Sequence, residues 1–213
     1  MVWQQHREGS VDPKVLVLGI GNLLWADEGF GVRAAEAMNA AYSFGPEVTL
    51  LDGGTQGLYL LPHLSGISCL IVFDAVDYGL TPGTMKIVRD DDVPSFMGAK
   101  KMSLHQTGFQ DVLAAAVLTG CKPQHILLIG VQPERLEDFG GGLSPSVAAM
   151  IDPAIDVALE ELKRFAITPT KAAGSEALND TAVARDAYEA GRPAPEVAFR
   201  DGDVRFVNMK AAH

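Results

Sequence analysis

Residues 14–22 read KVLVLGIGN and carry the clearest indication of the fold. A short run that is apolar throughout, rather than alternating with polar residues, is typical of a central strand buried on both faces of a parallel sheet. Apolar side chains then recur at helical spacing from Val32 to Tyr42, until Gly45-Pro46 ends the pattern. This part of the chain therefore predicts a buried strand, a loop and a helix.

The same alternation continues along the chain. Further strands are predicted at residues 48–51, 68–74 and 125–131, with an edge strand at 83–89. Helical patterns occupy residues 58–64, 103–119 and 145–165. Because strands alternate with helices and most of the strands are apolar throughout, the sequence predicts an α/β fold: a layered sandwich in which helices cover both faces of a largely parallel sheet.

Two of the predicted helices carry recognisable start signals. Ser103 to Gln106 has the spacing of a capping box, which places His105 in a first helical turn. The apolar stripe of that helix is Phe109, Val112, Leu113, Ala116 and Val117. Ser144 is the expected N-cap of the last helix, and Pro153 is expected to kink it.

Composition and charge exclude several classes of function. The chain has 213 residues, of which 47% are hydrophobic, so it can bury a sizeable core. Its formal net charge of −10 disfavours binding to nucleic acid or to an anionic membrane surface. No signal-peptide pattern or run of about 18 apolar residues is present, so we expect no membrane span. Cys69 and Cys121 are too few for a disulfide framework, which favours the cytoplasm, and Cys69 is expected to be a buried, inert thiol.

The length suits one domain with extensions. We expect an N-terminal extension at residues 1–13, the domain at 14–167, and a C-terminal extension at 168–213. The apolar periodicity ends near Phe165, so the C-terminal extension is expected to be mobile. Deletion of residues 171–213 is accordingly expected to leave the fold intact.

Four polar residues follow the predicted strands or open a helix at one edge of the sheet. Glu28 follows the first strand, Asp52 and Asp74 end the second and third strands, and His105 opens a helix. Because carboxyl ends of parallel strands meet in one crevice, Glu28, Asp74 and His105 could share a divalent cation. Acidic residues are also common there for capping reasons, so the residue pattern alone leaves both interpretations open.

A dinucleotide site is a weaker alternative. Gly19 and Gly21 follow the first strand and Asp52 stands where a ribose-binding acid would be, but Leu24 occupies the place of the third glycine. Asp27 and Glu28 would also repel a pyrophosphate. A tight turn accounts for the two glycines more simply.

Several motifs together resemble the maturation endopeptidases of [NiFe]-hydrogenases. The similarity spans about residues 14–165 and the motifs come in the family's order. They are residues 15–33 (VLVLGIGNLLWADEGFGVR), 51–57 (LDGGTQG), 71–75 (IVFDA), 82–85 (PGTM), 103–106 (SLHQ) and 130–134 (GVQPE).

The resemblance implies a three-layer sandwich with a five-stranded, mostly parallel, twisted sheet. It also implies an aspartic-type, metal-dependent endopeptidase that removes a C-terminal segment from a hydrogenase large-subunit precursor after nickel insertion and so activates it. In that family a Glu, an Asp and a His bind the metal, and these match Glu28, Asp74 and His105. Asp52 matches a further Asp, to which we assign a supporting or substrate-orienting role. The expected cofactor is nickel carried by the substrate, or another divalent cation at that site, and the protein is expected to be a monomer.

Two other functions remain open at this point. The same three residues could inspect a nickel-loaded precursor without cutting it, as an assembly chaperone does. A dinucleotide-dependent oxidoreductase would rest on Gly19, Gly21 and Asp52 instead. The sequence also leaves open whether the metal is a recognition element or takes part in hydrolysis.

Overall fold

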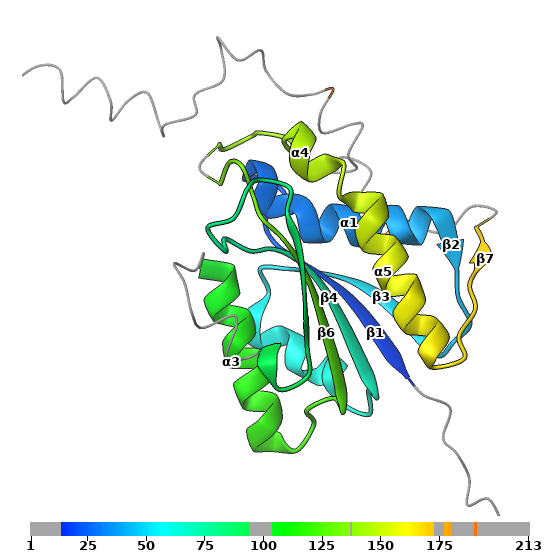
Figure 1. Ribbon diagram of the computed structural model, residues 1–213. Coiled ribbons are helices and arrows are strands. Elements are labelled where there is room, and N and C mark those ends of the chain that lie inside the picture. The colour runs from blue at the N-terminus through cyan, green and yellow to red at the C-terminus, as the bar shows by residue number, and fades with distance from the viewer. Residues whose placement is uncertain (1–13, 94–103, 137, 173–176, 180–189, 191–213) are drawn as a thin grey trace, which may run out of the picture.

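The computed structural model of the protein describes residues 14–93, 104–136, 138–172, 177–179 and 190. Strands and helical segments alternate along the chain (Figure 1). In chain order they are β1 (Val15–Ile20), η1 (Ala26–Gly29), α1 (Phe30–Ala41), β2 (Tyr42–Ser43), β3 (Val48–Gly54), η2 (Gly57–Leu64), β4 (Cys69–Ala75), β5 (Met85–Arg89), α3 (Leu104–Thr119), β6 (His125–Val131), α4 (Pro145–Ala148), α5 (Ile151–Arg164) and β7 (Thr170–Lys171). The segments η1 and η2 are 3₁₀ helices.

Five strands form the central sheet in the order β3-β1-β4-β6-β5. β1 pairs in parallel with β3 and β4, β4 pairs in parallel with β6, and β5 lies antiparallel to β6 at one edge. Every residue of β1 and β4 is buried, because both strands are central and covered on both faces. The predicted mostly parallel five-stranded sheet and its edge strand are thus confirmed.

Helices cover both faces of this sheet (Figure 1). On one face α1 and α5 enclose a core that includes Phe30 and Ile155. On the other face η2 and α3 enclose a second core that includes Leu64 and Phe109. The predicted three-layer sandwich is confirmed.

The last predicted helix, residues 145–165, is two helices, α4 and α5. The break falls at Ala149 and Met150, and Pro153 lies in the first turn of α5. A first-turn residue needs no intrahelical acceptor for its N–H, so proline is tolerated there. The interruption expected at Pro153 therefore falls one turn earlier, between α4 and α5.

The apolar stripe of α3 is narrower than predicted. Phe109, Val112, Leu113 and Ala116 are buried, but Val117 is 58% exposed. Each residue turns the helix by about 100°, so Val117 lies past the stripe that packs on η2 and the sheet. The capping box at Ser103 lies outside the described residues.

Part of the C-terminal extension contacts the domain. β7 pairs antiparallel with β2, which follows α1 directly. Leu178 is partly buried against the core beneath α1 and α5. For the rest of the extension, and for residues 1–13, the predictions lie outside the described residues.

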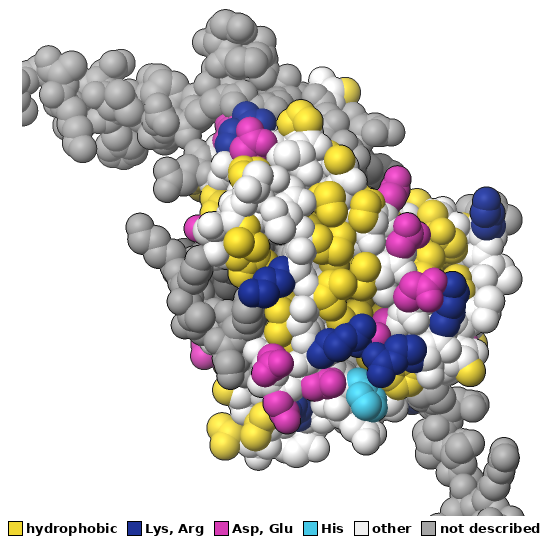
Figure 2. Space-filling model, in the orientation of Figure 1, with side chains coloured by type: hydrophobic (Ala, Val, Ile, Leu, Met, Phe, Trp, Pro, Cys, Tyr) yellow, Lys and Arg dark blue, Asp and Glu magenta, His cyan; other side chains and the backbone are white. Residues whose placement is uncertain are grey.

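The molecular surface mixes apolar and charged side chains. Figure 2 shows hydrophobic side chains gathered in the middle of one face, with Lys, Arg, Asp and Glu side chains interspersed and around the margin. Ile87 of the edge strand β5 is 45% exposed. Within the described residues, no helix combines the length and apolar composition needed to cross a membrane.

Candidate active site

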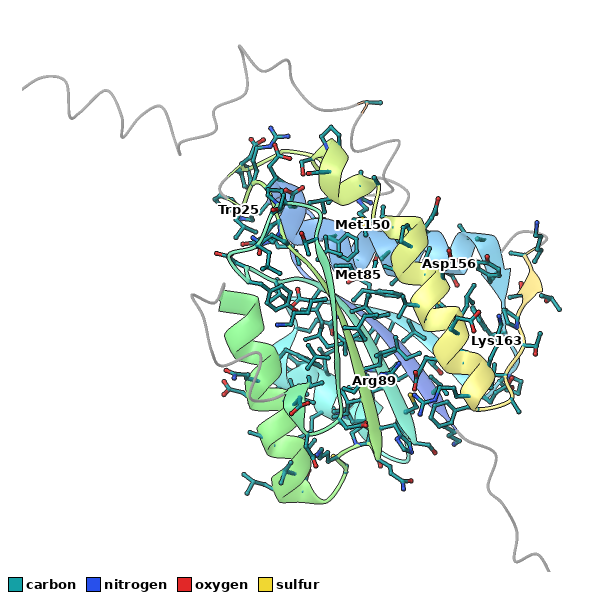
Figure 3. The ribbon with its side chains drawn as sticks, in the orientation of Figure 1. Trp25, Met85, Arg89, Met150, Asp156 and Lys163 are labelled. Carbon is teal, nitrogen blue, oxygen red and sulfur yellow. The ribbon has the colours of Figure 1, made fainter. Side chains whose placement is uncertain are left out.

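The candidate site lies at the carboxyl ends of the central parallel strands. The chain leaves β1 toward the face covered by α1, whereas the connection from β4 to β6 runs through α3 on the opposite face. Neighbouring strands whose connections diverge in this way leave a crevice between them, and ligands bind there in open α/β sheets. In Figure 3, Trp25 marks this end of the molecule and Arg89 marks the opposite end.

Asp74 lies in β4 at this crevice and is fully buried. Its register partner on β6 is Gly130, and the short helix η1 packs against β4. A side chain on Gly130 would collide with the hydroxyl of Tyr78, because a Cβ there would stand 2.1 Å from that oxygen. Burial and the nearby Asp74 charge raise the pKa of Tyr78, so its hydroxyl stays protonated at neutral pH beside the candidate ligand.

Glu28 lies in η1, in the loop that leaves β1. Gly21 adopts a φ of +139°, and a Cβ there would stand 1.8 Å from the carbonyl oxygen of Glu28, so only glycine fits this turn. Desolvation raises the pKa of the half-buried Glu28 carboxyl to about 7. At neutral pH the side chain can therefore exchange a proton readily.

Asp52, in β3, lies on the other side of β1 from Asp74. Its Oδ1 accepts a hydrogen bond of 2.7 Å from the amide of Gly54. Burial raises the pKa of Asp52, while hydrogen bonds from Asn179 and Gly54 oppose the shift. The hydrogen bond from Gly54 therefore orients the Asp52 carboxylate, which suits the supporting role predicted for it.

His105 is the second residue of α3, in its first turn as predicted. Its side chain is outside the part of the chain that the structure describes. Among the described side chains, no group of three His, Cys, Asp or Glu residues is arranged to hold a metal ion. Glu28 and Asp74 are brought to one crevice on contacting elements, and the cation site that they would share with His105 stays a prediction.

Comparison with known proteins establishes the family. Residues 32–161 match the family model described as hydrogenase maturation protease. The chain belongs to the hydrogenase maturation protease family.

Individual family members agree with this assignment along most of the chain. The hydrogenase expression/formation protein HoxM of Azotobacter vinelandii is 61% identical over 92% of this chain and 95% of its own length. The solved hydrogenase maturating endopeptidase HybD from Escherichia coli is 42% identical, with a TM-score of 0.70 over 74% of this chain and 97% of HybD. The [NiFe] hydrogenase maturation protease HybD from Thermococcus kodakarensis is 28% identical, with a TM-score of 0.59 over 70% of this chain and 98% of that protein.

In this maturation protease the glycine pattern has a packing role. A Cβ on Gly19 would stand 2.5 Å from the carbonyl oxygen of Gly31, and one on Gly31 would stand 2.2 Å from the carbonyl oxygens of Ile20 and Phe73. The start of α1 therefore presses directly on β1 and β4. This close approach explains Gly19 without a nucleotide, and it fixes η1 and Glu28 next to β4.

The sequence did not predict the role of Asp27. This carboxylate is fully buried and accepts four hydrogen bonds of 2.6–2.9 Å. The donors are the amides of Glu134, Arg135 and Ser144 and the hydroxyl of Ser144. Ser144 occupies the N-cap of α4 as predicted, but its hydroxyl donates to Asp27 and does not cap the helix. Asp27 thus fastens the loop that carries Glu28 to the loop after β6.

Gln132 holds the loop that follows β4. Its Oε1 accepts hydrogen bonds from the amides of Tyr78 (2.7 Å) and Leu80 (3.1 Å), and its Nε2 donates to Asp77 Oδ1 (3.0 Å). In the sequence, the only indication that Gln132 has a role was its place in the motif at residues 130–134. Its buried amide makes these bonds across more than 50 residues, which no local pattern reveals.

An open cleft adjoins these loops at the same end of the sheet. Its volume is about 480 Å³. Its lining residues are Asp77, Gln132, Pro133, Glu134, Arg135, Leu136 and Asp138. Neither Glu28 nor Asp74 lines it, but Glu134 and Arg135 are bonded to Asp27, so the cleft lies beside the loop that carries Glu28.

Proposed function

We propose that this maturation protease cleaves one peptide bond of a [NiFe]-hydrogenase large-subunit precursor and removes a C-terminal segment from it. The observation that carries this proposal is that Glu28 and Asp74 lie on contacting elements at the ligand-binding crevice of a chain that belongs to the hydrogenase maturation protease family. HybD from Escherichia coli is itself described as a hydrogenase maturating endopeptidase.

Nickel carried by the precursor is the proposed recognition element. Two carboxylates and a neutral imidazole are suitable donors for a borderline divalent cation, and the first turn of a helix disfavours a protonated His105. Glu28, Asp74 and His105 would hold the cation, and a bound cation can also polarise a carbonyl oxygen. Binding would displace the proton from Glu28 wherever it is still present, because a pKa of about 7 leaves about half of these carboxyls protonated at neutral pH. Asp52 would orient the precursor beside this group.

The surface around the crevice suits a folded protein substrate. Exposed apolar side chains follow four strands at this end: Leu24 after β1, Tyr59 after β3, Leu80 after β4 and Phe139 after β6. The rings of Trp25 and Phe139 pack edge to face at 5.3 Å, which joins two of these loops. Exposed apolar residues beside a polar cleft are typical of a surface that binds another protein.

We place the reaction in the cytoplasm and propose that the protease acts as a monomer. Both cysteines are free, and burial raises the pKa of Cys69 to about 12, which keeps it an inert thiol. Free thiols are usual in a reducing compartment. Light scattering of the full chain with and without precursor tests the proposed monomer.

The test of function is cleavage of purified precursor with and without nickel. Wild type, Asp74→Asn and His105→Ala are incubated with each precursor, and the precursor mass is measured. Of these three proteins, we expect only wild type to cause a mass loss, and only with nickel-loaded precursor. Asp111→Asn, on an exposed position of α3, is the matched control and should cleave like wild type. Equal processing in all arms would refute the metal-dependent site, and tight binding without a mass change would indicate a chaperone.

A further inference from the structure

The C-terminal extension returns to the helix that follows the glycine loop. Beyond α5, Thr170 and Lys171 pair with Ser43 and Tyr42, and the amide of Ala172 donates to the carbonyl of Ala41 at 3.0 Å. These contacts attach the extension to the end of α1.

Asn179 reaches the candidate site. Its Nδ2 donates to Glu36 Oε1 on α1 at 2.7 Å, and its side chain lies near enough to Asp52 to lower the pKa of that carboxyl. A side-chain amide carries two N–H donors, so one asparagine can bridge two carboxylates. Next to it, Leu178 packs on the core beneath α1 and α5.

The bridge joins groups that would otherwise repel each other. The negative charge of Glu36 raises the pKa of Asp52, whereas Asn179 and Arg33 lower it. Arg33 is buried and pairs with Glu36 Oε2 at 2.8 Å. Asn179 therefore bonds the Glu36 oxygen that Arg33 does not, and it counters the effect of the Glu36 charge on Asp52.

The matches with two relatives differ in whether they include the extension. The match with HoxM of Azotobacter vinelandii covers 196 of the 213 residues, so it must include residues 18–196 and with them Asn179. The match with HybD of Escherichia coli includes 97% of HybD but only 74% of this chain. A complete maturation protease fold thus exists with fewer residues, and the extension is an addition to it.

We propose that Asn179 is a positioning residue of the active site: it acts through Asp52 and Glu36, so that the C-terminal extension forms part of the site in this protease. The proposal rests on the proposed function for its effect on cleavage. Its structural content, that Asn179 bonds Glu36 and influences Asp52, is independent of that function.

The test measures Asp52 directly in the full, metal-free chain. The titration of the Asp52 carboxyl carbon is followed by NMR, with Asp52→Asn to assign the signal. Asn179→Ala should raise the pKa of Asp52, and Asn179→Asp should raise it further because a third carboxylate joins the cluster. Glu36→Gln should lower it. Ala177→Ser, at an exposed position of the same segment, is the matched control and should leave it unchanged.

Cleavage of the nickel-loaded precursor provides the second readout. We expect Asn179→Ala to reduce kcat/KM about tenfold, the loss typical of one hydrogen bond to a charged group, without a matching fall in Tm. An Asp52 titration that is identical in wild type, Asn179→Ala and Asn179→Asp would overturn the proposal. If wild type cleaves no precursor, the proposed function fails, while the titration still decides whether Asn179 positions Asp52.

Discussion

Two neighbouring acids, Asp27 and Glu28, have opposite environments although they lie in the same short helix, η1. Asp27 is fully buried and saturated with hydrogen-bond donors, whereas Glu28 is half-buried and its pKa is raised to about 7. A buried carboxylate with several donors is a structural anchor, and a desolvated one is suited to exchange a proton or a cation. The difference in burial and in hydrogen-bond donors therefore gives these two neighbouring residues different roles.

The raised pKa of Glu28 makes the stability of the metal-free protein depend on pH. The folded state binds the proton more tightly than the unfolded state, so stability is highest below the ordinary pKa of 4.5 and falls as pH rises toward 7. Glu28→Gln should remove this loss. We expect it to be more stable than wild type at pH 8 by about 1 kcal/mol, a value reduced for the partial exposure of the group, and to lose this advantage at pH 4. Urea unfolding at both pH values measures the difference, and an equal difference at both would contradict it.

Asp27→Asn should weaken the junction between the Glu28 loop and the loop after β6. The side-chain oxygen of asparagine can accept some of the four hydrogen bonds that Asp27 accepts. Its NH₂ group, however, would face other N–H and O–H donors. We expect a loss of about 3 kcal/mol in the free energy of unfolding, because charge-assisted bonds in a buried site are lost. Denaturant titration measures it, with exposed Asp111→Asn as the control. A change as small as that of the control would show that the junction does not depend on the Asp27 charge.

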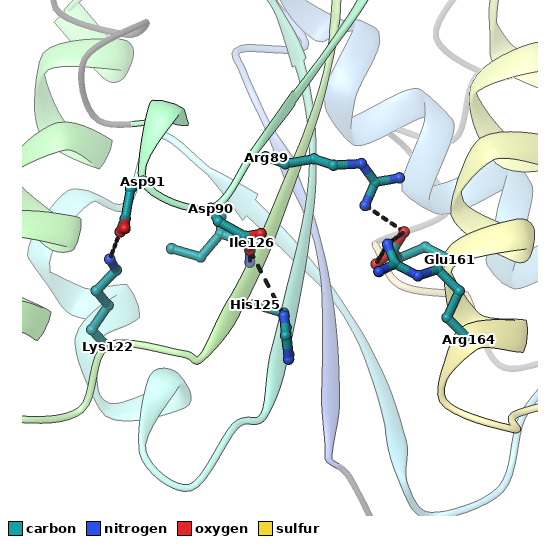
Figure 4. Close-up of polar contacts among 8 residues, drawn as sticks. All are labelled: Arg89, Asp90, Asp91, Lys122, His125, Ile126, Glu161 and Arg164. Carbon is teal, nitrogen blue, oxygen red and sulfur yellow. Dashed lines mark hydrogen bonds and ion pairs between the residues drawn. The ribbon is translucent and has the colours of Figure 1, made fainter.

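At the scale of elements, an ion-pair cluster ties the edge strand β5 to α5 at the end of the sheet opposite the site. Glu161 of α5 is buried and accepts bonds from Arg89 (2.7 Å) and Arg164 (3.0 Å), as Figure 4 shows. Beside it, Asp90 Oδ1 accepts a bond of 3.0 Å from the amide of Ile126, which joins the end of β5 to β6. These contacts hold in place an edge strand that has a partner on one side only.

Glu161→Gln should loosen this connection without touching the site. We expect a loss of about 1.5 kcal/mol in the free energy of unfolding, because a buried acceptor of two arginines loses its charge. Precursor cleavage at a temperature where the variant is folded should be unchanged. Asp91→Asn removes the exposed pair with Lys122 in Figure 4 and should give no measurable change in stability. Loss of cleavage in the folded Glu161→Gln variant would show that β5 communicates with the site.

In the molecule as a whole, the described part of the extension adds little to the two cores. The two cores are built almost entirely from residues 15–167, and the extension adds the partly buried Leu178. Among the described residues of the extension, only β7 forms a strand, and it pairs with β2 outside the main sheet. Asn179, a further described contact, is close to Asp52.

Deletion of residues 173–213 should leave a folded protein. We expect a loss of about 1 kcal/mol from the partial burial of Leu178, and a cooperative unfolding transition. Thermal and urea unfolding of the truncated chain measure this. A non-cooperative transition would mean that the extension completes the core, as would a truncated chain that is insoluble. A second truncation after Ile167, which also removes β7, separates the contribution of the strand pair.

The fold class follows from the amino-acid sequence alone. Burial on both faces requires strands that are apolar throughout, and few folds combine such strands with alternating helices. The motifs around Glu28, Asp52, Asp74 and His105 also determined the family. Contacts between distant segments could not be read from the sequence: the four bonds to Asp27, the amide of Gln132 on the loop after β4, and Asn179 on Asp52. A local sequence pattern indicates which face of a helix or strand is buried. The hydrogen-bond partner of a buried polar group instead depends on how loops more than 50 residues apart come together, so it is known only from the folded structure.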